Sequence, residues 1–251
     1  MKEDFEALIC GMSFWAIKER VKDHTIQRKP TEQLLKRMDI YRMDAVARRD
    51  LLAMEEGKDQ LAFVHEKGKL LRTSGLMKAH SWVIAYLQCQ ESLWAHPQGA
   101  TPSDGVSIKD TGGTNRSMTS LSSWGTTNSF YGGLEAPSTN NLYGILWGTG
   151  TTTPATADYM MTPLITHGSS AGLLQYGATT VNAAGVVAAN VDMIISRVAV
   201  NGSGGTVTPR EQGLVTARFT PYYFLWAHDA VNQAIGNTEV VVGSYCWRTT
   251  V

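Results

Sequence analysis

Hydrophobic residues in the first third of the chain recur at the three- and four-residue spacings of a helix. Leu34, Met38 and Tyr41 begin one such series, and charged residues of both signs fill most positions between them. Residues at these intervals share one helical face, so the series predicts a helix over residues 31–56 with an exposed charged side. A second apolar series predicts a shorter helix over residues 3–22. The chain is therefore expected to begin with a helical region.

The third predicted helix, over residues 74–93, carries apolar residues on every side. A helix of that kind must be covered on most of its surface, and two other helices can hardly cover it alone. Neighbouring subunits or the C-terminal half of the chain must supply the cover. The pattern favours self-assembly into a homo-oligomer, and the candidate assembly contacts are Leu76, Trp82, Ile84 and Leu87.

The texture of the chain changes at Pro97, where Gly, Ser, Thr, Asn and Pro replace the periodic pattern. The stretch without a periodic pattern is 45 residues long, from 97 to 141. Irregular loops of that length are uncommon inside compact domains. Trp124, Phe130 and Tyr131 are nevertheless too apolar for a free linker. We therefore expect residues 97–141 to form an ordered arm that packs on a neighbour, with these three aromatic side chains as further candidate assembly contacts.

Short extended runs alternate with turn residues after residue 141. The predicted strands cover residues 142–147, 159–166, 173–181, 186–200, 213–219, 221–228 and 238–248. The Asn201-Gly202 turn signal predicts a hairpin whose return strand begins at Thr206. Strands without intervening helices are typical of an antiparallel sandwich or jelly roll. The expected fold class is α+β: a helical docking region over residues 1–96, the arm over 97–141 and a β-sandwich or jelly-roll domain over 142–251.

Composition and charge exclude several classes of function. The chain has 251 residues with 22 basic and 22 acidic side chains, so it carries no net field that would attract nucleic acid. No apolar run approaches the length of a membrane-spanning helix, and the charged start does not resemble a signal peptide. The three cysteines lack the spacing of a disulfide framework or a metal site. We expect no membrane partner, no specific nucleic acid and no metal, and a protein made in a reducing compartment.

Three motifs resemble chemical sites, and none has the expected context. Residues 168–172 match the G-x-S-x-G nucleophile motif around Ser170, but a strand-like run follows where that motif requires a helix. The Gly-Thr-rich residues 148–152 lack the lysine of a phosphate loop, so a tight turn is the simpler role. His228 and Asp229 are neighbours on a predicted strand, where adjacent side chains point to opposite faces. The sequence therefore predicts no catalytic residue and no cofactor.

Several motifs in the second half share their order and spacing with a known family. They are 144–152 (GILWGTGTT), Asp158-Tyr159, 164–168 (LITHG), 173–177 (LLQYG), Ser196-Arg197, Asn201-Gly202, Glu211-x-Gly213-Leu214 and 226–231 (WAHDAV). On these motifs the chain resembles, over about residues 78–251, the virion structural proteins of tailed viruses of bacteria and archaea. His228 departs from the family pattern, which has arginine before the aspartate. The resemblance implies turn and core positions, and it brings no catalytic residue.

The leading interpretation is a structural component of a virus particle, in the tail, in the neck or associated with the capsid. Such a protein is made in the host cytoplasm, resides in the virion and binds copies of itself and other virion proteins. The alternative is a carbohydrate- or receptor-binding module of a viral appendage, which uses the aromatic residues in 222–226 to bind a host surface glycan. A hydrolase is the third interpretation, and we do not expect an enzyme.

Overall fold

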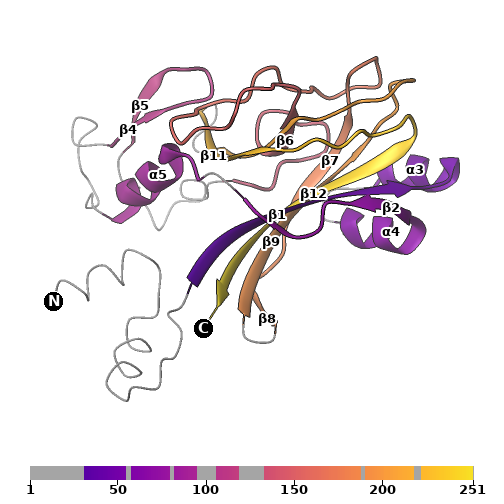
Figure 1. Ribbon diagram of the computed structural model, residues 1–251, viewed down its shortest axis with the longest axis horizontal. Helices are drawn as coiled ribbons and strands as arrows, with labels where there is room; N and C mark the ends of the chain where they lie inside the picture. Colours follow the sequence, from indigo (N-terminus) through magenta and orange to yellow (C-terminus); the bar gives the residue numbers. More distant parts are fainter. Residues whose placement is uncertain are drawn as a thin grey trace.

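The computed structural model describes residues 31–54, 58–79, 82–94, 106–118, 133–187, 190–217 and 222–250. These residues form mostly antiparallel β-structure in which two sheets pack face to face (Figure 1). The β-rich, sandwich-like architecture expected from the second half of the sequence is confirmed. The helix predicted over residues 3–22 lies outside the described residues.

The larger sheet has the strand order β2-β1-β12-β9-β7, with β3 also paired to β1 and β8 to β9. All of these pairs are antiparallel. The strands are β1 (Thr31–Arg42), β2 (Lys69–Thr73), β3 (Met77–Lys78), β7 (Gln175–Val181), β8 (Gly185–Val187), β9 (Asn190–Val200) and β12 (Glu239–Thr250).

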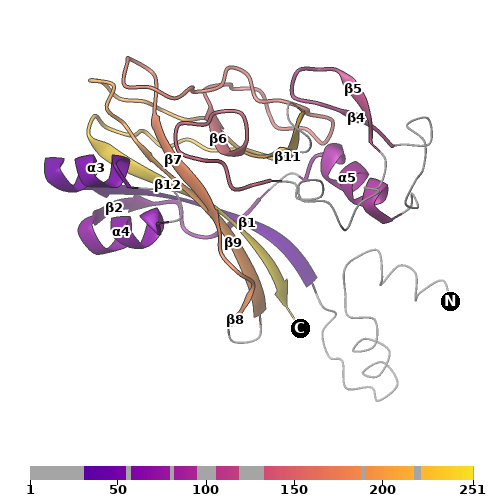
Figure 2. The same cartoon turned by 180° about the vertical axis from the view of Figure 1, so that it is seen from behind.

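The smaller sheet has the order β11-β10-β6, and a separate hairpin joins β4 to β5. These strands are β4 (Val106–Lys109), β5 (Asn115–Met118), β6 (Gly144–Gly148), β10 (Glu211–Ala217) and β11 (Tyr223–Ala230). The described helices are α3 (Ala45–Leu52), α4 (Gln60–Lys67) and α5 (Ile84–Trp94). Figure 2, from behind, shows α3 and α4 beside the larger sheet and α5 near the β4–β5 hairpin.

Residues 31–42 form an interior strand of the larger sheet, so the helix predicted over residues 31–56 is wrong except for the short α3. Leu34, Met38 and Ile40 of β1 belong to the core between the sheets, whereas Tyr41 packs with α3 and α4 on the other face. A strand that is covered on both faces carries apolar residues at odd and even spacings. The helical spacing in this segment was therefore a coincidence of two buried faces.

Three further predictions need correction. The helix predicted over residues 74–93 begins only at Ile84, after β3. The run 159–166 forms only an isolated bridge at Leu164, because Pro163 lacks an N–H for a ladder. The predicted hairpin is absent from the described chain, since β9 pairs with β12 and β7 while Val207 bridges to Ile235.

The turn after β9 carries the chain from the larger sheet toward the smaller one. The buried side chain of Asn201 donates to the carbonyl oxygens of Gly205, at 2.9 Å, and Ile235, at 2.7 Å. These bonds fix the turn against the segment that precedes β12. The turn signal in the sequence was thus correct, and only the partner of the following residues differed.

The described parts of the expected arm pack on their own subunit. Residues 106–118 form the β4–β5 hairpin. Leu134 and Ala136 are buried, and the Ala136 carbonyl accepts a hydrogen bond from the Thr179 amide at 2.7 Å. The prediction that this arm packs on a neighbouring molecule is therefore wrong for these residues, because the sandwich itself supplies the surface.

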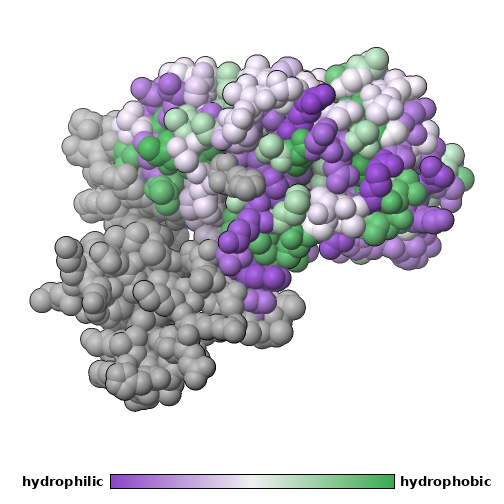
Figure 3. Space-filling model, viewed as in Figure 1, coloured by the Kyte–Doolittle hydropathy of each residue, from purple (hydrophilic) through white to green (hydrophobic). Residues whose placement is uncertain are grey.

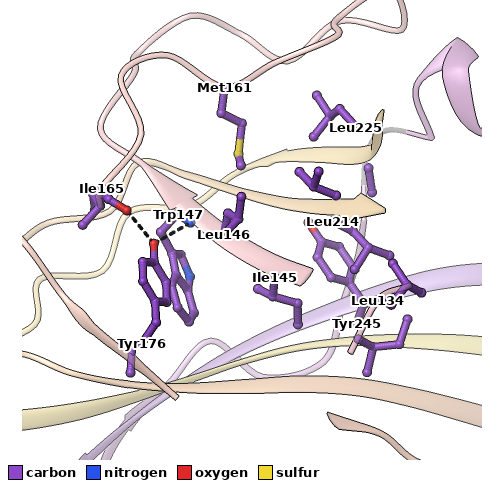
Figure 4. Close-up of a cluster of buried hydrophobic side chains, with 14 of the residues drawn as sticks. Leu134, Ile145, Leu146, Trp147, Met161, Ile165, Tyr176, Leu214, Leu225 and Tyr245 are labelled. Carbon is purple, nitrogen blue, oxygen red and sulfur yellow. Dashed lines mark hydrogen bonds between the residues drawn. The ribbon is translucent and has the colours of Figure 1, made fainter. Parts of the chain in front are cut away.

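The core between the sheets is dominated by aromatic and branched side chains (Figure 4). Trp147 of β6 stacks on Tyr176 of β7 with ring centroids 5.5 Å apart. The Tyr176 hydroxyl donates to the Ile165 carbonyl at 2.8 Å and accepts from the Trp147 amide at 3.3 Å. The stack therefore anchors the segment after β6 as well as filling the core.

Arg197 of β9 is fully buried and organises the entry into the smaller sheet. Its guanidinium donates to five backbone carbonyls, those of Pro137, Asn140, Tyr143, Ile145 and Gly177. It also lies over the Tyr176 ring, 4.5 Å from the centroid. Burial lowers the pKa of Arg197 to about 10, so the side chain stays charged near neutral pH.

We predict that Arg197→Met destabilises the protein by about 3 kcal/mol or more, because several buried carbonyls lose their donors together. Denaturant unfolding measures the loss. Arg49→Met is the matched control, since the Arg49 side chain is 74% exposed and its replacement is expected to change stability by less than about 0.5 kcal/mol. Equal stability of the two variants would contradict the organising role of Arg197.

Candidate assembly surface

Helix α5 docks at one end of the sandwich through its inner side. Ala85, Tyr86 and Cys89 are buried there. The backbone just before the helix is also tied down, because the Val83 amide donates to the Trp226 carbonyl at 3.0 Å. The helix is thus held by both packing and backbone hydrogen bonds.

An aromatic cluster fixes this docking. Trp82 and Tyr86 stack with centroids 3.9 Å apart. Tyr86 also meets Trp226 and Trp247 edge-on, at 5.4 Å and 5.5 Å. Trp82, expected as an assembly contact, therefore lies half-buried within its own subunit, with its ring engaged by Tyr86 and Trp247.

The outer side of α5 leaves large apolar side chains in solvent. Ile84 is 53% exposed and Leu87 is 63% exposed. Leu76 and Met77, before the helix, are 47% and 42% exposed. Figure 3 shows hydrophobic residues over this region of the surface. The expected contacts Leu76, Ile84 and Leu87 are therefore exposed, and the described residues leave the outer side of the helix uncovered.

The remaining expected contacts, Trp124, Phe130 and Tyr131, lie outside the described residues. The structure therefore describes only the first four candidates.

The larger sheet extends beyond the smaller one, which the sequence did not reveal. Figure 1 shows the ends of β1, β12 and β9 projecting from the sandwich with β8 at their tip. On one face Val186 is 79% exposed and its cross-strand neighbour Val191 is 39% exposed. Between β12 and β9, the Arg248 guanidinium donates hydrogen bonds of 2.8 Å and 2.6 Å to the Asp192 carboxylate. The projection therefore combines an internal ion pair with exposed apolar residues.

Two polar clusters flank β11, on opposite faces of the smaller sheet. Asp229 points into the core, where it meets Lys36 at 3.2 Å and Tyr245 at 3.0 Å. His228 points to the outer face, where its Nδ1 lies 2.7 Å from Asp158 and its Nε2 lies 3.4 Å from Glu211. The prediction that the two neighbours face opposite ways is confirmed.

The Gly-Thr-rich turn after β6 leaves room for the Glu211 side chain. A Cβ on Gly148 would lie 2.5 Å from Glu211 Oε2, and a Cβ on Gly150 would overlap Glu211 Oε1. Glycine at both positions allows a buried carboxylate to approach the backbone. The turn therefore packs against the buried side chain of Glu211, and the tight-turn interpretation of residues 148–152 gains a physical reason.

Ser170 lies on the surface in an irregular turn. The Leu173 amide donates to its carbonyl at 3.1 Å, and β7 follows at Gln175. This is the strand-like continuation that the sequence indicated, and it differs from the strand–turn–helix geometry of a nucleophile elbow.

The aromatic run before and in β11 is engaged within the subunit. Tyr222 lies under the Arg116 guanidinium at 4.2 Å, and Tyr223 stacks on Tyr143 at 5.9 Å. Phe224 is fully buried. These contacts occupy ring faces that a bound glycan would need.

Among the described residues, no cluster of three His, Cys, Asp or Glu side chains is suited to a metal ion. Within the same part of the chain, no helix has the length and apolar character needed to cross a membrane. Cys89 and Cys246 are buried cysteines. No family model, curated protein or solved structure matches the chain.

We predict that Gly150→Ala destabilises the protein by about 1–3 kcal/mol, because the added methyl group would lie 2.6 Å from the Thr162 carbonyl oxygen and displace Glu211. Thermal or denaturant unfolding measures the change. Gly205→Ala is the control, since its Cβ would meet nothing within 4 Å. A stable Gly150→Ala protein with an unchanged transition would contradict the packing role of this turn.

Proposed function

We propose that this chain is a structural subunit that acts by self-association, as a building block of a virus particle. The observation that carries the proposal is the two-sided character of α5. Its inner side packs on the subunit through Tyr86 and the surrounding tryptophans, while Ile84 and Leu87 are exposed on its outer side. Ile84 and Leu87 are three residues apart and therefore neighbours on the helix surface, and contiguous exposed apolar side chains are typical of protein–protein contacts.

The motifs behind the resemblance to virion proteins support the same proposal. Arg197, Asn201, Glu211 and Asp229 all belong to them, and all four are buried. Each makes contacts that hold turns or sheets together. These residues maintain the scaffold, which is the role that the resemblance implies for the motifs.

Association in solution tests the self-assembly part of the proposal. We predict an oligomer at micromolar concentration by sedimentation velocity. Replacing Ile84 and Leu87 together by glutamate is expected to weaken association about tenfold or more, because two apolar side chains that the proposed contact would bury become charged. Circular dichroism and unfolding check that the variant keeps its fold.

The matched control is Val46→Glu on α3, where the apolar side chain is 57% exposed on another part of the surface. It is expected to associate like the wild type. A wild-type monomer at these concentrations, or equal loss of association in both variants, would contradict an assembly contact on α5.

The virion part of the proposal has its own test. Mass spectrometry of purified virus particles is expected to find the chain in multiple copies per particle. Its absence from intact particles, together with association in solution, would leave a self-associating protein with a role outside the virion.

A further inference from the structure

The loop between β6 and the following core segment is fastened at three separate places. Asp158 reaches His228 on β11. The Thr156 carbonyl accepts a hydrogen bond of 2.8 Å from the Ile84 amide, at the start of α5. The Tyr159 ring lies 4.8 Å from the Lys109 ammonium on β4. Residues 149–161 therefore connect the smaller sheet, α5 and the β4–β5 hairpin.

The fastening on β11 is a histidine between two carboxylates from different segments. The His228 and Glu211 side chains are only 4% and 3% exposed, whereas Asp158 is 26% exposed. Asp158 Oδ2 also accepts from the Ala155 amide at 2.7 Å, which folds the loop around the carboxylate. Among the described residues, Asp158 and Glu211 are the only titratable groups in ion-pair contact with His228.

The number of protons bound by Asp158, His228 and Glu211 determines how strongly these side chains hold the loop. If Nδ1 donates to Asp158, Nε2 faces the Glu211 carboxylate. Nε2 of His228 and Oε2 of Glu211 are both buried without a hydrogen bond to any described residue. One proton shared on this side makes the contact favourable, because it pairs a donor with an acceptor. Without that proton, a lone pair faces a buried carboxylate, which is unfavourable in a poorly solvated site.

We propose that Asp158, His228 and Glu211 form a proton-dependent latch that holds residues 149–161, and with them the start of α5, against the smaller sheet. In the protonated state the latch is closed by two contacts to the imidazole. In the deprotonated state the Glu211 carboxylate repels the lone pair on His228 Nε2, and the loop opens more often.

The direction of the pH effect follows from Glu211. Burial raises the pKa of Glu211, and His228 only partly opposes that shift. A raised pKa in the closed state means that the closed state binds the proton more tightly than the open state. Stabilisation by the latch is therefore complete below the ordinary pKa of a glutamate and is lost as pH rises through the raised value.

The latch has a consequence for assembly that depends on the proposed function. Ile84 contributes both the amide that binds the loop and an exposed side chain on the proposed contact surface. Opening of the loop removes one backbone anchor from the start of α5. Association is therefore expected to weaken as pH rises.

Hydrogen exchange of the wild-type protein, corrected for the intrinsic pH dependence of exchange, tests the latch. We expect the protection of residues 149–161 to fall as pH rises from about 5 to about 9, by up to about tenfold per pH unit where one proton is coupled. Protection of β9, in the larger sheet, is expected to stay constant over the same range.

Two variants show whether Glu211 causes the pH dependence of loop protection. Glu211→Gln keeps the shape of the side chain and cannot ionise, so the pH dependence of the loop is expected to disappear. His65→Gln removes an exposed imidazole on α4 and is expected to retain the wild-type pH dependence. The same pH dependence in Glu211→Gln and the wild type would overturn the latch.

A wild-type measurement covers the case in which Glu211→Gln does not fold. The side-chain carboxyl carbon resonance of Glu211, followed by NMR, is expected to change at the same pH as loop protection. Midpoints that differ by more than about one pH unit would overturn the latch. Sedimentation across the same pH range separates the two proposals, since a monomer with a pH-dependent loop contradicts self-assembly and leaves the latch supported.

Discussion

The buried ion pair between Lys36 and Asp229 joins the two sheets, and the arrangement of the smaller sheet depends on it. The Lys36 side chain is 5% exposed and that of Asp229 is fully buried. Lys36 also donates to the Ala230 carbonyl at 2.8 Å, and the Tyr245 hydroxyl lies within hydrogen-bond distance of Asp229 and of the Gln212 carbonyl. Two charges removed from water are unfavourable unless partners satisfy them in a defined geometry. The pair therefore selects one placement of β11 over β1 and β12.

This placement connects the core to the proposed surface. The Trp226 carbonyl on β11 accepts a hydrogen bond from the Val83 amide, and the Tyr86 ring lies edge-on against Trp247 of β12. Among the described residues, nothing covers the outer side of α5, where Ile84 and Leu87 are exposed. Ile84 and Leu87 remain available to a second molecule because the inner side of the helix is already occupied. The shape of the core and the proposed assembly contact are thus parts of one arrangement.

Local rules predicted the parts of the fold that depend on neighbours along the chain. The opposite directions of His228 and Asp229 follow from the period of a strand, and most extended runs after residue 141 form strands. β1 escaped prediction because both of its faces are buried, which hides the alternation of a half-exposed strand. The contacts of Arg197 and Glu211 escaped prediction because they bring together segments far apart in sequence. The apolar pattern around α5 pointed to its residues as assembly contacts; Ile84 and Leu87 are exposed in the structure, and their role in assembly stays a prediction.

Covalent footprinting with a carbene reagent tests whether α5 is the contact between subunits, because it reports the accessibility of individual side chains. Labelling is compared below and above the concentration at which the protein associates. Labelling of Ile84 and Leu87 is expected to fall on association, while labelling of Val46 on α3 is expected to stay constant. Equal labelling of Ile84 and Leu87 in both states, or protection of Val46 instead, would contradict the assignment of α5 as the contact between subunits.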